Sequence, residues 1–310
     1  MSIYKNANVF YSSESGHSNF AKHKDMIYAH FEAQKINCKI IEIPKPLQEL
    51  HNLVSQAIDE GVDLFVAAGG DGTASLIGDL LVGTGKHLGV LPLGTGNSLA
   101  KELKIPIKFE KALDLISNDN LNIIQMDTFQ LDGRHYLLNL STGVSPHIML
   151  GTDTREKQRF GFFAYLVHFG KQLLGLKRHR FEISFDGTET SQLASEILIT
   201  NCRITPLEPL EWADHIKIND GALDLFIIRA ANIFDVAGVI ISIFTKRQHM
   251  NPVIKIFQIK DYCRITSQFP LPTQADGDPV GETPAEITVN PGSLNIIAGK
   301  QELYKKNTKE

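Results

Sequence analysis

Two glycine-rich stretches are the parts of this sequence best suited to phosphate chemistry. The first, from Gly69 to Thr73, is Gly-Gly-Asp-Gly-Thr, and the second, from Pro92 to Asn97, is Pro-Leu-Gly-Thr-Gly-Asn. Glycine lets backbone N–H groups approach an anion more closely than a residue with a Cβ would. Asp71 would repel a phosphate unless a divalent cation or its bound water lies between them, so this residue suggests Mg²⁺.

The elements around these stretches would place both at one edge of a sheet. Residues 62–68 and 88–91 are short apolar runs that predict buried strands, and each run ends at a glycine-rich stretch. Helices are expected over 74–82, with Thr73 as the cap, and over 98–103. Strands that alternate with helices predict a parallel α/β sheet, which binds ligands beyond the carboxyl ends of its strands.

The first forty residues extend the same pattern. A strand is expected over 8–11, and a helix follows the small polar loop 12–17. Such a loop can also hold phosphate, so Ser12, Ser13 and Ser15 are further candidates for nucleotide binding. The whole region 1–128 is therefore predicted to be an α/β nucleotide-binding domain.

From about residue 123 the pattern changes to strand-like runs separated by turns. Asp132-Gly133 and Asp186-Gly187 are dipeptides typical of hairpins. The region 129–297 is predicted to be mainly antiparallel, and the tail from about 298 to 310 would return to the first domain. Helices are expected over 160–176 and 233–245, and strands over the following residues: 123–131, 136–140, 181–185, 196–200, 223–228, 253–259, 261–266, 285–289 and 294–297.

Composition excludes several classes of function. The 310 residues, 43% of them hydrophobic and 21% charged, suit a soluble protein of two domains. A net charge of −4 gives no support for nucleic-acid binding. Three cysteines at distant positions predict reduced thiols, and with no signal-peptide pattern the expected location is cytoplasmic. The apolar run 160–169 with the basic run 177–180 could pack on the second domain or make peripheral contact with a membrane.

Four motifs together resemble the diacylglycerol kinase and sphingosine kinase superfamily of lipid kinases, especially its bacterial members. Besides the two glycine-rich stretches, the motifs are Asp220-Gly221-Ala222-Leu223-Asp224 and Gln274-Ala275-Asp276-Gly277-Asp278-Pro279. They occur in the family's order along nearly the whole chain. The resemblance implies an α/β nucleotide domain, a β-sandwich lipid domain and an active site in the cleft between them.

What is known of this family implies transfer of the γ-phosphate of ATP to a lipid hydroxyl, as in phospholipid biosynthesis. By this resemblance Asp71 organises Mg²⁺ through its water shell, Asp127 lies near the metal, and Asp278 is the general base. Positioning and charge neutralisation supply most of the catalysis in such a transfer. The residues that would bind the nucleotide are Gly69, Gly70, Asp71, Gly72, Thr73, Gly94, Thr95, Gly96 and Asn97.

Several departures from the family pattern leave alternatives open. Asp278 replaces the usual Glu, so Asp276 is a second candidate for the base. Ser75 and Ser98 stand where the family often has Asn and Asp. Asp220 lies either in a hairpin-type turn or at a structural Mg²⁺ site. The alternative functions are an NAD kinase and a nucleotide- or lipid-binding regulator with little turnover, and a homodimer remains open.

Overall fold

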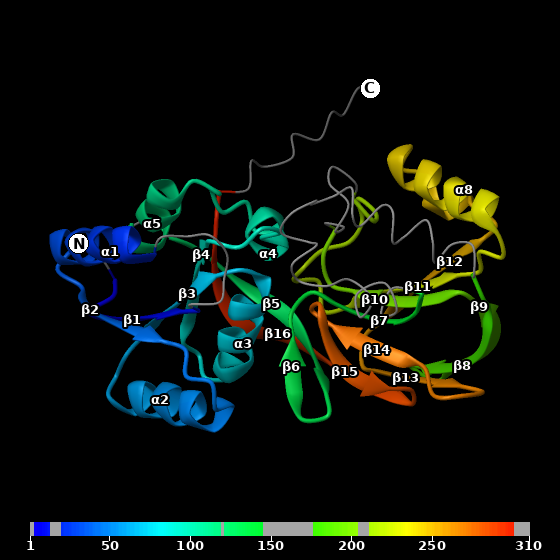
Figure 1. Ribbon diagram of the computed structural model, residues 1–310, viewed down its shortest axis with the longest axis horizontal. Helices are drawn as coiled ribbons and strands as arrows, with labels where there is room; N and C mark the ends of the chain where they lie inside the picture. The colour runs from blue at the N-terminus through cyan, green and yellow to red at the C-terminus, as the bar shows by residue number, and fades with distance from the viewer. Residues whose placement is uncertain (1–2, 13–19, 119–120, 145–175, 204–210, 301–310) are drawn as a thin grey trace. The chain divides into compact units, whose positions relative to one another are not determined.

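The computed structural model divides the chain into two compact units. One unit comprises Met1–Met126 with Leu294–Glu310, and the other comprises Asp127–Ser293. The chain passes between the units inside β5 (Asn122–Leu131) and inside β16 (Ala285–Ala298) (Figure 1). The boundary predicted at residues 128 and 129 also falls inside β5. The structure describes residues 3–12, 20–118, 121–144, 176–203 and 211–300.

The first unit is built on a parallel sheet, which confirms the predicted α/β class. Its strand order is β2 (Asn37–Glu42), β1 (Asn6–Tyr11), β3 (Leu64–Gly69), β4 (His87–Pro92) and the last part of β16. Every neighbouring pair is parallel. All six residues of β3 are buried, as expected for a central strand covered on both faces.

Among the residues that the structure describes, five helices belong to this unit. Figure 1 shows α1 and α5 on one face of the sheet, with α2 and α3 on the other. The sequence pattern did not single out α5, because its apolar stripe spans only nine residues. The helices are α1 (Phe20–Ala33), α2 (Leu47–Asp59), α3 (Asp71–Leu81), α4 (Ser98–Glu102) and α5 (Phe109–Ser117).

The second unit is a β-sandwich of two antiparallel sheets, as predicted. One sheet contains the first part of β16, then β13 (Tyr262–Ser267), β8 (His179–Phe185) and β9 (Thr188–Ala194). The other runs in the order β12 (Ile254–Ile259), β11 (Leu223–Ile228), β10 (Glu196–Thr200), β7 (Asn139–Gly143), β14 (Pro272–Ala275) and β15 (Asp278–Glu282). Apolar side chains from both sheets, such as Ile183 and Leu225, form one buried core between them. This burial is the main force that holds the sandwich together.

A helix covers part of the outer face of the second sheet. This helix, α8 (Ile233–Phe244), is followed by the short helix η1 (Gln248–Met250). Val239 and Ile243 of α8 pack with Phe226 of β11 in a smaller apolar cluster. The amide-bearing Asn232 caps α8, because its Oδ1 accepts hydrogen bonds from the N–H groups of residues 234 and 235.

Three Asp-Gly dipeptides make two-residue hairpin turns with positive φ at both residues. Two were predicted: Asp132-Gly133 joins β5 to β6 (Arg134–Tyr136), and Asp186-Gly187 joins β8 to β9. The strand predicted over 136–140 is in fact two strands, β6 and β7, whereas the two predicted after residue 284 form the single strand β16. The predicted helix over 160–176, except its last residue, and most of the tail lie outside the described residues.

Candidate active site

The first glycine-rich stretch joins the central strand β3 to helix α3. The helix begins at Asp71, three residues earlier than predicted, and Gly70 occupies the N-cap position. The prediction that Thr73 caps the helix is therefore wrong. Thr73 is instead buried beside Gly69, and a Cβ added at Gly69 would collide with the hydroxyl group of Thr73. Among the described residues no side chain caps α3, so the N–H groups of its first turn and the helix dipole suit a phosphate.

The second stretch follows the neighbouring strand β4 and holds its own shape through Asn97. The Asn97 Oδ1 accepts a hydrogen bond from the N–H of Gly94 at 3.0 Å, and its Nδ2 donates to the Gly94 carbonyl at 2.7 Å. Asn97 is buried and has a left-handed backbone with φ of 52°. Its amide therefore fixes the loop, and direct nucleotide contact by Asn97 stays a prediction.

Asp71 joins the two stretches. Its carboxylate oxygens accept hydrogen bonds from the N–H groups of Ser98 at 3.0 Å and Leu99 at 2.9 Å, at the start of α4. The loops also touch directly, because a Cβ on Gly94 would lie only 2.5 Å from the Gly70 Cα. The expectation that both stretches lie together at the carboxyl edge of the sheet is thus fulfilled.

The residues around Asp71 are compatible with a hydrated Mg²⁺ ion. Each carboxylate oxygen accepts one N–H in the structure and retains a further lone pair. In the described part of the chain, no three His, Cys, Asp or Glu side chains gather as a metal site. An ion here would take its remaining ligands from nucleotide phosphates and water, the usual mode for Mg²⁺.

The predicted serine loop begins at the same sheet edge. Ser12 follows β1, which pairs with β3 up to Tyr11 and Ala68, so Ser12 continues from the strand next to the first glycine-rich stretch. Ser13 and Ser15 lie outside the described residues. Their nucleotide-binding role stays a prediction.

Asp127 is buried in the second unit, and hydrogen bonds fix both its side chain and its backbone. Its carboxylate accepts hydrogen bonds from the N–H groups of Gly221 and Gly292, each at 2.7 Å. Its own N–H donates to the Ile218 carbonyl, and its carbonyl accepts from Asn201. Burial raises the pKa of Asp127, although the hydrogen bonds from Gly292 and Gly221 oppose this change. These contacts fix the Asp220-Gly221 turn, which lies directly before β11 in the connection from β10, and the structural Mg²⁺ site at Asp220 stays a prediction.

A contact between an exposed histidine and a buried aspartate lies close to this turn. Asp224 is 2% exposed, and its Oδ1 is 3.0 Å from the Nε2 of His215. Burial raises the pKa of Asp224, the charge and hydrogen bond of His215 lower it, and the charge of Asp220 raises it again. Sequence reasoning assigned no role to His215, because nothing in its spacing links it to Asp224.

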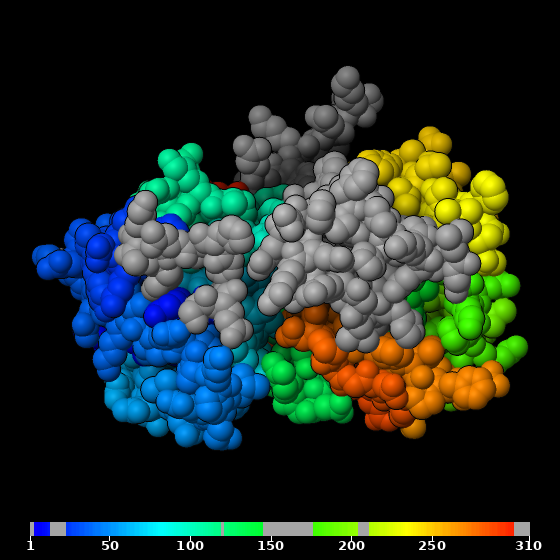
Figure 2. All heavy atoms as spheres, in the orientation of Figure 1, coloured from blue at the N-terminus to red at the C-terminus, as the bar shows by residue number. Residues whose placement is uncertain are grey.

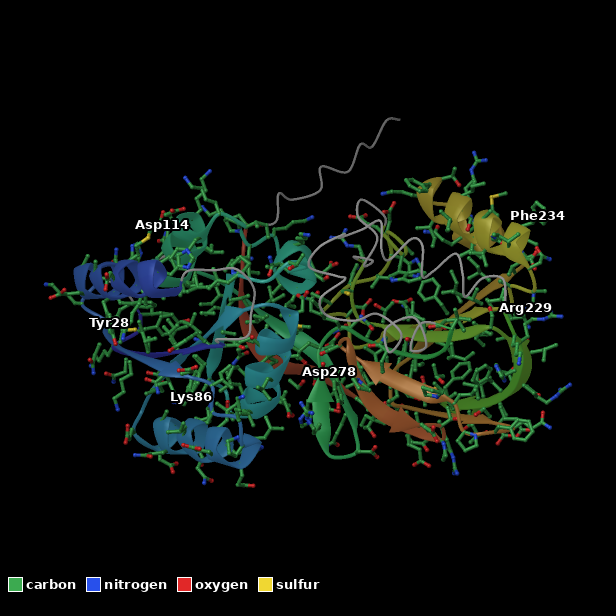
Figure 3. The ribbon with its side chains drawn as sticks, viewed as in Figure 1. Tyr28, Lys86, Asp114, Arg229, Phe234 and Asp278 are labelled. Carbon is green, nitrogen blue, oxygen red and sulfur yellow. The ribbon has the colours of Figure 1, made fainter. Side chains whose placement is uncertain are left out.

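The fourth motif forms the hairpin between β14 and β15. Its first acid, Asp276, has φ of 50° and accepts hydrogen bonds from the N–H groups of Leu137, Leu138 and Asn139 at 2.8 to 3.0 Å. The second acid, Asp278, is exposed as the first residue of β15 (Figure 3). Asp276 therefore holds the turn and Asp278 is exposed to solvent, while the assignment of either acid as the general base stays a prediction.

Gln274 also holds this turn, and sequence reasoning placed it in the fourth motif without assigning it a role. Its Oε1 accepts a hydrogen bond from the N–H of Gly277 at 2.8 Å. Its Nε2 donates to Asn139 and Ser141, at 2.9 Å each. Gln274 is buried, and a long polar side chain within the short strand before Asp-Gly was the only available signal.

Comparison with known families accounts for both units. Residues 6–130 match the diacylglycerol kinase catalytic domain, and residues 139–298 match the YegS C-terminal NAD kinase beta sandwich-like domain. The chain belongs to the diacylglycerol kinase and sphingosine kinase superfamily of lipid kinases. Both domains of this superfamily are present, in the order that the four motifs predicted.

Individual relatives cover most of the chain. It is 25% identical over 302 residues to the diacylglycerol kinase of Bacillus subtilis, covering 96% of this chain and 97% of that protein. It is 28% identical over 250 residues to a Yersinia enterocolitica protein named "Probable lipid kinase YegS-like", covering 78% and 80% of the two chains. A crystal structure of a diacylglycerol kinase from Bacillus anthracis has the same fold, with a TM-score of 0.77, 19% identity and coverage of 96% and 99%.

Two positions that depart from the superfamily pattern, Ser75 and Ser98, lie in the helices that follow the glycine-rich stretches. Ser98 is the first residue of α4, and its N–H donates to Asp71. Ser75 is buried in α3.

None of the helices in the described part of the chain has the length and apolar composition that a membrane span requires.

Proposed function

We propose that this protein is an ATP- and Mg²⁺-dependent kinase that transfers the γ-phosphate of ATP to the hydroxyl group of a lipid. The observation that carries the proposal is the joining of two glycine-rich loops by Asp71 in a chain whose first domain matches the diacylglycerol kinase catalytic domain. The acceptor would be a diacylglycerol-like lipid or a sphingoid base.

The nucleotide would bind at the loops of the first unit. The N–H groups at the start of α3 would receive the phosphates, and the open space at Gly72 favours this, because a Cβ there would meet no described atom within 4 Å. Asp71 would hold the hydrated Mg²⁺. When bound, Mg²⁺ supplies positive charge that neutralises the phosphate oxygens.

Asp278 would act as the general base of the transfer. It would accept the proton of the lipid hydroxyl as the hydroxyl oxygen forms its bond to the γ-phosphorus, and ADP leaves with the electrons of the broken P–O bond. Its exposure supports this role, whereas the carboxylate of Asp276 already accepts three backbone hydrogen bonds.

The test is an assay of the purified protein with labelled ATP, Mg²⁺ and a panel of diacylglycerols, sphingoid bases and NAD. We expect label in a lipid, and a loss of at least about 100-fold in Asp71→Ala and Asp278→Asn, the scale of a lost general base. Label in NAD alone would replace the proposal with an NAD kinase, which the description of the second domain's family keeps as the second candidate. Nucleotide binding without any transfer would identify a regulator.

A further inference from the structure

Helix α8 is apolar on two opposite faces. Val239 and Ile243 on one face are buried against Phe226. The opposite face, here called the outer stripe, consists of Ile233, Phe234, Ala237, Ile241 and Phe244, all exposed. A helix that is apolar all round is normally covered on every side. The outer stripe therefore needs a partner.

Polar groups are absent from the outer stripe itself. The acid of α8, Asp235, lies away from the stripe on the helical projection, and its carboxylate accepts a hydrogen bond from the N–H of Ala231. The hydroxyl of Ser242 is buried and donates to the Val239 carbonyl. Phe234, which Figure 3 labels, is 83% exposed. Phe244 is 61% exposed, so large aromatic side chains meet water near both ends of the stripe.

Basic residues follow the helix directly. Lys246, Arg247 and His249 are exposed just beyond Phe244, and the apolar side chain of Met250 in the same segment is also exposed. Lys246 lies 2.6 Å from Asp214 and 3.8 Å from Glu211, which leaves Arg247 as the stronger source of positive charge at this end. An apolar helix face with cationic groups at its end complements a lipid surface with anionic head groups.

The size of the outer stripe argues against a second copy of the chain as the partner. A helix of 12 residues is about 18 Å long, and with a width of about 10 Å the stripe covers roughly 180 Å². A stable protein interface needs about 800 Å² on each partner. A bilayer has no such requirement, because each inserted apolar side chain contributes by itself.

We propose that the outer stripe of α8 docks this protein on an anionic phospholipid bilayer, with Phe234 and Phe244 inserted and Arg247 among the head groups. Figure 2 shows α8, in yellow, on the surface of the molecule. This inference goes beyond the proposed phosphoryl transfer. Its test measures vesicle binding alone, so the failure of one proposal can be told from the failure of the other.

The experiment is co-sedimentation of the full chain with vesicles of phosphatidylglycerol and phosphatidylcholine, and with vesicles of phosphatidylcholine alone. Phe234→Ser and Phe244→Ser are compared with the matched control Phe269→Ser, since Phe269 is 64% exposed but lies outside α8. We expect each stripe variant to bind the anionic vesicles about tenfold more weakly, and the control to bind like the wild type. Higher salt should weaken binding by screening the basic residues.

A fluorescence measurement tests insertion directly. Phe234→Trp should shift its emission to shorter wavelength when anionic vesicles are added, whereas Phe269→Trp should not, with the native Trp212 signal subtracted in both. Equal vesicle binding by the wild type and the double variant Phe234→Ser/Phe244→Ser would overturn the proposal. A dimer that the double variant loses, with no vesicle binding by the wild type, would assign the stripe to a second copy and overturn it as well.

Discussion

The carboxylate of Asp71 accepts a hydrogen bond from the backbone N–H of Leu99 at 2.9 Å, across 28 residues of sequence. A second bond from the N–H of Ser98 reaches the other oxygen. One acid in the first glycine-rich loop therefore sets the position of the second loop. The same acid is the one proposed to hold hydrated Mg²⁺, so a structural and a ligand role coincide at Asp71.

Asp71→Asn should weaken ATP binding far more in the presence of Mg²⁺ than in its absence. The amide removes the charge that attracts the ion and replaces one acceptor by a donor, which cannot receive an N–H. We expect about a 100-fold loss of phosphoryl transfer, the scale of a lost general catalyst. Calorimetric titration with ATP, with and without Mg²⁺, measures the difference.

Asp59→Asn, at the last residue of α2, is the control and should bind ATP normally. If the Asp71→Asn deficit were the same with and without Mg²⁺, Asp71 would only tie the loops together.

Gly72 and Gly94 should respond differently to alanine. A Cβ at Gly94 would lie 2.5 Å from the Gly70 Cα, so Gly94→Ala must push the loops apart and should cost about 1–3 kcal/mol of unfolding free energy. Gly72 has open space and a helical position, so Gly72→Ala should leave stability unchanged or raise it by about 0.5–1 kcal/mol. Thermal unfolding of the two variants gives this comparison.

The ATP affinity of Gly72→Ala then tests whether the open space at Gly72 receives a phosphate of the nucleotide. A methyl group at this position would occupy the place proposed for a phosphate, so we expect at least about a tenfold loss of affinity, equivalent to 1.4 kcal/mol. Wild-type affinity in a stable Gly72→Ala protein would place the phosphates elsewhere.

Asp276 and Asp278, two residues apart, should separate a structural role from a catalytic one. Asp276→Asn leaves an N–H of the 137–139 segment without its acceptor and should cost about 1–3 kcal/mol of stability. Asp278→Asn should leave stability unchanged and lower kcat by about 100-fold or more. Asp278→Glu, which carries the longer side chain usual in the superfamily, should keep transfer, in contrast to Asp278→Asn.

The pH dependence of the rate should show whether Asp276 or Asp278 is the general base. We expect the acidic limb of the kcat profile to persist in Asp276→Asn and to disappear from the residual activity of Asp278→Asn. The opposite pattern would make Asp276 the base. Denaturation curves for both variants keep loss of folding apart from loss of catalysis.

Local patterns in the sequence were enough to predict the two-domain architecture. The buried runs before Gly69 and before Gly94 have the composition of central parallel strands, and the Asp-Gly pairs at 132 and 186 require positive φ. The sequence predicted the start of α3 three residues too late, because glycines such as Gly70 and Gly72 have a low helix propensity. In the folded protein the helix begins at Asp71, directly after β3, despite these glycines.

Contacts between distant residues could not be predicted in the same way. Nothing near Asp276 in the sequence shows that its carboxylate would bind the backbone of Leu138, or that Gln274 would reach Ser141. Such bonds depend on β7 lying next to β14, and that pairing is a property of the folded sheet. The hydrogen bonds of Asp127 with Gly221 and Gly292, and of His215 with Asp224, could not be predicted for the same reason.

The contact between exposed His215 and buried Asp224 should make stability depend on pH. Burial raises the pKa of Asp224 and His215 opposes this, so removing the imidazole in His215→Ala should raise that pKa further. A raised carboxyl pKa favours the folded state below the unfolded value of about 3.9, and this advantage is lost as the pH rises through the folded value. His215→Ala should therefore cost about 1–3 kcal/mol at pH 7.5 and clearly less at pH 4.

Urea denaturation of the wild type and His215→Ala at both pH values measures this difference. His249→Ala, which removes an exposed histidine of η1, serves as the control and should change stability little at either pH. As the pH falls through the raised pKa of Asp224, protonation removes its buried negative charge, and the loss caused by His215→Ala should shrink. An equal loss at both pH values would show that His215 contributes through packing, and that the charge of Asp224 is balanced by other groups.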